Sequence, residues 1–385
     1  MSRVHVALVP GFFGFANLGD LTYFGHVHAF LRAAYAARGY EPVLHVVRTY
    51  PTASLVRRTV RLLDTLVADA ADDAPIHLVG HSSGGLDCRL LLAPGVALPS
   101  AHPVEPIARR VTRVVTVATP HRGTPLASFF STRLGGTLLE LLSLATIHAL
   151  RIGQTPLSVV LAIGAAYAKL DDIGPNSVLL DQLFRDLLAD FTPERRHAIT
   201  QFLSDVREDQ ALLTQITPDA MEPFAATTRD RPGVAYGAVV TRATPPTLRS
   251  WTLPGLDPSA HVLHLIYRAL HAATRDSDAR LPALDPAAVQ RLRAAYDTLP
   301  DPTDNDGVVP TLSQLHGDLV HATCGDHLDV IGHFGDEHVV PPHFDWLVTG
   351  SGFDHARFEA TWSAIADYLT AARPASGAGS AGSPP

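Results

Sequence analysis

The chain has 385 residues, of which 46% are hydrophobic and only 18% are charged. An ordinary soluble domain carries about 25% charged residues, so this composition excludes intrinsic disorder and a strongly solvated helical array. The formal net charge of -8, without any block of lysine or arginine, argues against a nucleic-acid partner. Two cysteines, Cys88 and Cys324, are too few for a disulfide framework and are expected to be free thiols.

The first part of the chain alternates strand and helix patterns. Short apolar runs that predict strands cover residues 4–9, 43–47, 76–80 and 113–118. Helical spacing lies between them at residues 27–38, 55–70 and 85–92. Strands separated by helices pair in parallel, with helices on both faces of the sheet. The predicted fold class is therefore α/β, with a mostly parallel central sheet.

Residues 124–231 interrupt this alternation with a long helical pattern. We expect this insertion to form a cap, or lid, over the active face of the sheet. The stretch 137–170 within it is strongly apolar, but Arg151, Gln154 and Pro156 divide it into pieces shorter than the roughly 18 residues of a membrane span. No transmembrane segment is therefore expected.

The alternation resumes beyond the cap. Strands are predicted at residues 234–241 and 319–324, and helices at residues 281–299 and 358–371. We expect a single domain over residues 1–373, with its core at 1–123 and 232–373. Residues 374–385, rich in glycine, serine and proline, are expected to form a flexible tail.

The run Gly80-His81-Ser82-Ser83-Gly84 is a G-x-S-x-G motif between a predicted strand and a predicted helix. In this context the motif is typical of a nucleophile elbow, a strained turn that projects the serine above the sheet. Only Ser82 has a glycine two residues away on both sides, so Ser82 is the predicted nucleophile. His81 is expected to point away from the site and to pack. The alternative interpretation of the motif is an ordinary glycine-rich turn.

A serine nucleophile needs N–H donors for the negative charge that develops on the substrate oxygen. The elbow geometry predicts two such donors: the main-chain N–H of Ser83, and one N–H from the loop after the first strand. That loop reads Val9-Pro10-Gly11-Phe12-Phe13-Gly14, and Phe12 is the predicted second donor of the oxyanion hole.

Three segments, LVPGFFGF, LVGHSSGGLDCRLL and VVTVATPHRGTPLASFF, resemble the oxyanion loop, the nucleophile elbow and the following strand and loop of bacterial true lipases. These are triacylglycerol lipases of the Pseudomonas and Burkholderia type, in the α/β-hydrolase superfamily. The resemblance covers residues 4–130 and 284–335, and it implies the α/β-hydrolase fold. One departure is Pro10-Gly11 in place of the usual His-Gly, which keeps the backbone donor but loses the hydrogen bonds of that histidine.

The base and the acid are expected after the elbow, in the order Ser, Asp, His that this fold imposes. The resemblance implies Asp306, in the turn NDGVV, as the acid and His327, in the motif HLD, as the base. Asp304 is the rival acid, and His321 and His333 are the rival bases. In this scheme the histidine takes the proton of the nucleophile, and the aspartate orients the imidazole.

No spacing typical of a zinc site is present in the sequence. The resemblance implies instead a structural Ca²⁺ beside the catalytic histidine loop, held by Asp285 in the motif LDP and Asp329 in HLD, with carbonyls from residues 333–337. Oxygen ligands on a loop suit Ca²⁺. The alternative is that Asp285 is a helix N-cap and Asp329 an ordinary loop acid. No organic cofactor is expected.

We therefore predict a serine hydrolase that cleaves carboxylic esters through an acyl-enzyme. Long-chain acylglycerols are the expected substrates, because an apolar lid can open at a lipid–water interface. The alternatives are a carboxylesterase, thioesterase or acyltransferase on smaller acyl substrates, a non-catalytic protein that binds a hydrophobic ligand, and a membrane-surface protein. The N-terminus lacks a signal-peptide pattern, so the chain as given is expected to be cytoplasmic, or secreted if a leader has been removed.

Overall fold

The computed structural model describes residues 1–12, 23–131, 192–276, 278, 282–336, 338, 343 and 345–372. The expected tail at 374–385 and the apolar stretch 137–170 of the expected cap lie outside these residues. No helix within the described ranges is both long and apolar enough to cross a membrane.

Six parallel strands form one sheet in the described part of the chain, in the order β2-β1-β3-β4-β5-β6. The strands are β1 (Ser2–Val9), β2 (Tyr40–Val46), β3 (Ile76–His81), β4 (Val111–Val117), β5 (Ala235–Arg242) and β6 (Asp318–Cys324). Every predicted strand is found, with small shifts at its ends. The strand order reverses at β1, which lies between β2 and β3. In open parallel sheets, ligands bind at the carboxyl ends of the strands beside such a reversal.

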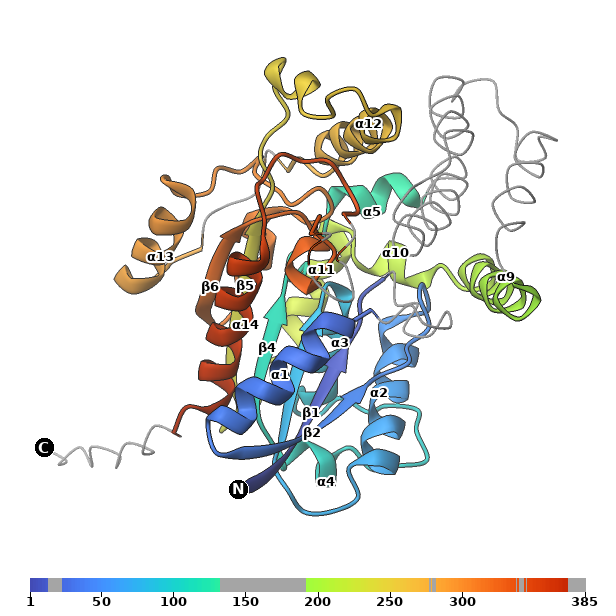
Figure 1. Cartoon of the computed structure of the whole chain (residues 1–385). Helices are drawn as coiled ribbons and strands as arrows, with labels where there is room; N and C mark the ends of the chain where they lie inside the picture. The colour runs from blue at the N-terminus through green and yellow to red at the C-terminus, as the bar shows by residue number, and fades with distance from the viewer. Residues whose placement is uncertain are drawn as a thin grey trace, which may run out of the picture.

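The strands are apolar along their whole length because the sheet is covered on both faces. In β1, Val6 and Leu8 belong to one core cluster, together with residues of α1 (Gly25–Ala37) and α14 (His355–Thr370). The alternating residues Ala7 and Val9 belong to a second cluster, with α2 (Leu55–Asp69) and α3 (Ser83–Leu92). Successive side chains of a strand point to opposite faces, so these helices form a layer on each side of the sheet (Figure 1). The predicted α/β class is confirmed.

Two helix boundaries differ from the sequence prediction for local reasons. Helix α3 begins at Ser83, directly after the turn at Ser82. Helix α13 (Pro286–Tyr296) is shorter than the predicted 281–299 because Asp285 caps it, accepting a hydrogen bond of 2.8 Å from the N–H of Ala288. It ends at Asp297, which has a left-handed conformation with φ of 63°.

The other described helices are short or peripheral. They are α4 (Glu105–Ala108), α5 (Pro125–Phe130), α9 (Pro193–Glu208), α10 (Ala211–Gln215), α11 (Pro218–Thr227) and α12 (Pro258–Ala273), with 3-10 turns η1 (Arg249–Thr252), η2 (Thr311–Gln314) and η3 (Asp329–Ile331). Helices α5, α10 and α12 lie beyond the carboxyl ends of the strands (Figure 1). Helix α12 was missed by the sequence prediction. The extent of the cap, residues 124–231, stays a prediction, because the described residues include only its two ends.

Candidate active site

Ser82 stands at the turn between β3 and α3, where the backbone is strained. Its φ of 54° lies in the left-handed region, which residues other than glycine rarely adopt. The N–H of Ser82 donates to the carbonyl of Val117 at 2.8 Å, which fixes the turn to the end of β4. A Cβ on Gly80 would lie 2.5 Å from the carbonyl oxygen of Gly84, and a Cβ on Gly84 would lie 2.2 Å from that of Val9. Both glycines are therefore required by close packing, as in a nucleophile elbow.

The loop after β1 lies directly beside this turn, because β1 and β3 are neighbouring parallel strands. A Cβ on Gly11 would lie 2.4 Å from the Cβ of Ser82 and 2.9 Å from its Oγ. Phe12 follows in the chain and lines the same pocket as Ser82. Ser83 is fully buried as the first residue of α3. The backbones that carry the two predicted oxyanion donors, Phe12 and Ser83, thus flank the predicted nucleophile.

Two buried side chains hold the loop after β1. The guanidinium of Arg58 donates to the carbonyl of Pro10 at 2.8 Å and also pairs with Asp87, with 2.8 Å between Nη2 and Oδ2. Both charged side chains are fully buried. From another direction, the hydroxyl of Tyr23 accepts a hydrogen bond of 3.2 Å from the N–H of Gly11. The loop is therefore held at two successive residues.

Asp306 and His327 are joined by a hydrogen bond of 2.8 Å between Oδ2 and Nδ1. The second carboxylate oxygen, Oδ1, accepts from the N–H groups of Val308 and Val309 at 2.9 and 2.7 Å. Thr241 Oγ1 also donates to Oδ2, at 2.8 Å. A buried carboxylate with this many donors is held in one orientation.

The rival acid Asp304 has a different partner. Its carboxylate pairs with the guanidinium of Arg242 at 3.1 Å. The described rival histidines lie elsewhere: His321 is in β6, and His333 is in the loop after η3. The aspartate and the histidine that the structure brings together are those implied by the resemblance, Asp306 and His327.

An apolar pocket contains both Ser82 and His327. Its walls come from three helices at the carboxyl ends of the strands and from the loops around them. They include Leu126, Ala127 and Phe130 of α5, Leu213 of α10 and Leu270 of α12, together with Val308 and Trp346. The described ends of the expected cap thus contribute to the pocket, and α12, which the sequence prediction missed, supplies part of the wall.

His81 lies outside the lining of this pocket and is fully buried. Burial, and then the charge of the neighbouring His327 ring, hold the pKa of His81 well below its usual range, so the imidazole is neutral. The packing role expected from the sequence is incomplete, because both ring nitrogens are hydrogen-bonded, to Tyr23 and to the His327 main chain. These contacts join residues far apart in the sequence, so no local sequence pattern predicts them.

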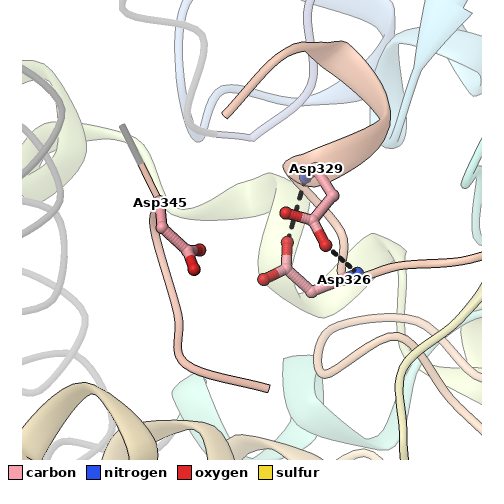
Figure 2. Close-up of side chains that lie close together, drawn as sticks. All are labelled: Asp326, Asp329 and Asp345. Atoms are coloured by element: carbon pink, nitrogen blue, oxygen red, sulfur yellow. Dashed lines mark hydrogen bonds between the residues drawn. The ribbon is translucent and has the colours of Figure 1, made fainter. Parts of the chain in front are cut away.

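Three aspartates beside the His327 loop form a cluster, Asp326, Asp329 and Asp345, whose ligand atoms lie within 4.8 Å of one another. Figure 2 shows Asp345 facing the other two carboxylates from a separate segment. One oxygen of Asp326, Oδ2, is buried without a hydrogen-bond partner. Burial, and then the charges of Asp329 and Asp345, raise the pKa of the Asp326 carboxyl well above its usual range, and burial raises that of Asp345 to about 7. This donor set fits a hard divalent cation.

Asp285, the other predicted calcium ligand, is not among the clustered carboxylates of the described residues. It caps α13 and lines a surface hollow with Leu315 and Leu319, at the beginning of β6. Asp329 follows the other end of that strand, and a strand of this length spans roughly 20 Å. The carboxylates that do lie near Asp329 are those of Asp326 and Asp345. Of the loop 333–337 expected to supply carbonyls, Glu337 lies outside the described residues.

No protein-family model matches the chain, and no curated protein matches it. Among solved structures, the chain is similar to EstA from Clostridium botulinum, with a TM-score of 0.52 and 18% identity, over 97% of this chain and 88% of the other. Lipase 1 from Pelosinus fermentans has a TM-score of 0.51 and 18% identity, over 97% and 100%. Staphylococcus hyicus lipase has a TM-score of 0.50 and 18% identity, over 96% and 95%.

The sheet order, the elbow and these neighbours define an α/β-hydrolase fold, as the sequence predicts. The neighbours include bacterial lipases. At this level of identity the likeness concerns the fold alone. The finer resemblance to lipases of the Pseudomonas and Burkholderia type stays a prediction.

Substitution of Arg58 tests how much the buried pair of Arg58 and Asp87 contributes to the free energy of unfolding. We expect Arg58→Met to lower the free energy of unfolding by about 3 to 5 kcal/mol, because Asp87 would remain buried and unpaired. Adding Asp87→Leu should recover part of this loss, since no charge is then left without a partner. Urea denaturation measures both changes.

The matched control is Arg109→Met, which removes an arginine whose side chain is 75% exposed in its pair with Glu105. Its unfolding curve should match that of the unmodified chain, because exposed pairs contribute little. Equal losses in Arg58→Met and Arg109→Met would contradict a special role for the buried pair.

Proposed function

We propose that this chain hydrolyses carboxylic esters, with Ser82 as the nucleophile, His327 as the base and Asp306 as the acid. The observation that carries the proposal is the hydrogen bond between Asp306 Oδ2 and His327 Nδ1, beside a pocket that Ser82 and His327 line together. Because Nδ1 is held by the carboxylate, Nε2 is the nitrogen that would receive the proton of Ser82.

The reaction proceeds in two halves. His327 Nε2 takes the hydroxyl proton while Ser82 Oγ attacks the carbonyl carbon of the ester, and the N–H groups of Ser83 and Phe12 stabilise the oxyanion. His327 then gives the proton to the leaving alcohol, and the acyl group stays on Ser82. In the second half, water loses a proton to His327 and attacks the acyl-enzyme, which releases the acid and restores Ser82.

The nature of the pocket wall supports a substrate with an apolar acyl chain. Leucine, phenylalanine and alanine side chains from α5, α10 and α12 line the pocket together with Ser82, and Val308 and Val309 from the turn after Asp306 add to the apolar wall. We propose long-chain acylglycerols as the substrates, with smaller esters, thioesters and acyl transfer to another alcohol as the alternatives.

For p-nitrophenyl esters from acetate to palmitate, kcat/KM should rise with chain length as more apolar surface is buried. A maximum at acetate would favour a carboxylesterase.

Variants of the proposed triad test the mechanism. Ser82→Ala should lower kcat by roughly 10⁴ to 10⁶, and Asp306→Asn by about 10⁴, because the amide favours the wrong tautomer of His327. The losses in Asp306→Asn and His327→Ala should not add in the double variant, since the residues act as one unit. Steady-state turnover of a soluble p-nitrophenyl ester measures each loss.

Asp304→Asn is the matched control for the acid, because Asp304 pairs with Arg242. It should keep most of the activity. Normal turnover in Asp306→Asn together with collapse in Asp304→Asn would move the acid by two positions. Normal turnover in Ser82→Ala would contradict the proposed nucleophile.

We also propose that Asp326, Asp329 and Asp345 hold a structural Ca²⁺ ion. The support is the closeness of three carboxylates and the buried oxygen of Asp326 that has no hydrogen-bond partner. When bound, the cation would neutralise these charges next to His327 and stabilise the loop that carries the base.

A chelator tests this site. Because an ion bound only by the folded state stabilises it by mass action, excess EDTA should lower the melting temperature of the unmodified chain. Asp329→Asn should remove that sensitivity. Asp285→Asn, which keeps an N-cap side chain, should retain it. An unchanged melting curve in EDTA, with no calcium found by elemental analysis, would contradict the proposal.

A further inference from the structure

A buried hydrogen-bond chain runs through the side chains of Tyr23 and His81. The hydroxyl of Tyr23 contacts His81 Nδ1 at 2.6 Å, and His81 Nε2 contacts the main-chain carbonyl of His327 at 2.8 Å. At its other end, the same hydroxyl accepts from the N–H of Gly11 at 3.2 Å. Tyr23 is 3% exposed and His81 is fully buried.

The proton positions in this chain are determined by its ends. The carbonyl oxygen of His327 can only accept, so His81 Nε2 carries the proton. The buried imidazole is neutral, so Nδ1 has no proton and must accept from the hydroxyl of Tyr23. Burial also raises the pKa of Tyr23, which therefore keeps its hydroxyl proton. The oxygen of Tyr23 then has a lone pair that accepts the hydrogen bond from the N–H of Gly11. Each hydrogen bond along this series therefore has one donor and one acceptor.

The hydrogen-bond chain joins three segments that lie far apart in the sequence. Gly11 lies in the loop after β1, directly before Phe12, and His81 is the last residue of β3, directly before Ser82. His327 lies in the loop after β6. The rings of His81 and His327 are also close, with 4.7 Å between their centroids. Both ends of the chain are main-chain groups, so it constrains the backbones that carry the oxyanion donor and the base.

We propose that Tyr23 and His81 are positioning residues, whose hydrogen bonds fix the His327 backbone and the oxyanion loop at the correct distance around Ser82. This inference rests on the proposed ester hydrolysis and assigns no contact between His81 and the substrate. A small displacement of a base or an oxyanion donor lowers the rate of the chemical step more than it lowers substrate binding. The predicted signature is therefore a fall in kcat with little change in KM.

The experiment compares Tyr23→Phe, His81→Phe and His81→Gln on a soluble p-nitrophenyl ester, with melting temperatures measured alongside. Tyr23→Phe keeps the ring that lines the pocket and removes only the hydroxyl. Tyr23→Phe and His81→Phe should each lower kcat by about tenfold or more, with KM unchanged within about twofold. His81→Gln should recover part of the loss, because its amide N–H can donate to the His327 carbonyl.

The protein contains a matched control on the same strand. The hydroxyl of Tyr35 contacts His77 Nδ1 at 2.8 Å, and both side chains are buried, but His77 lies earlier in β3, away from Ser82. Tyr35→Phe removes the same kind of bond and should leave kcat unchanged. The double variant Tyr23→Phe/His81→Phe should be no slower than the slower single variant, because both changes break one chain.

Unchanged kcat in Tyr23→Phe and His81→Gln would overturn the positioning role, even if His81→Phe fails to fold. Equal losses of kcat in Tyr23→Phe and Tyr35→Phe would also overturn it, because the effect would then be general destabilisation. Failure of the proposed function looks different: the unmodified chain, correctly folded by its melting curve, would turn over no ester at all, and the positioning role would fall with it.

Discussion

The arrangement of the site depends on the contact between the backbones of β1 and β3 at their carboxyl ends. The strand order reverses at β1. Because β1 and β3 are neighbouring parallel strands, the loop after β1 and the turn after β3 emerge side by side. Gly11 approaches Ser82 so closely that a methyl group would not fit, and Gly84 approaches the end of β1 in the same way. Gly11 packs against the side chain of Ser82 and Gly84 against the backbone at the end of β1, so a side chain at either glycine would clash. These contacts constrain the relative position of the predicted nucleophile and the oxyanion loop.

The backbone conformation of Ser82 has a free-energy cost, which interactions of the surrounding structure offset. A residue other than glycine in the left-handed region is destabilised by about 1 to 3 kcal/mol, and Ser82 has this conformation. Its N–H is bonded to β4, and two buried pairs hold the segments of the site: Arg58 with Asp87, and Asp306 with His327. Buried polar groups with satisfied partners hold one geometry, and such preorganisation is what the proposed hydrolysis requires.

The sequence was sufficient to predict what depends on local patterns. Apolar runs of strand length predicted a sheet buried on both faces, and the glycine spacing predicted the frame of the elbow at Ser82. Contacts between segments far apart in the sequence could not be predicted from local patterns. Asp285 was expected beside Asp329, but an aspartate before a proline serves equally as a helix N-cap, which is its role here. Asp345, whose carboxylate does lie close to Asp329, comes from a segment with no recognisable motif, and the bond between Tyr23 and His81 spans 58 positions.

The most direct test of the account is stoichiometric reaction with diethyl p-nitrophenyl phosphate, which phosphorylates a serine only where a base and oxyanion donors activate it. If Ser82 is the activated nucleophile, one p-nitrophenolate is released per chain, and peptide mass spectrometry finds the diethylphosphoryl group on Ser82. Release of no p-nitrophenolate from correctly folded protein, or a phosphoryl group on any other residue, would contradict it.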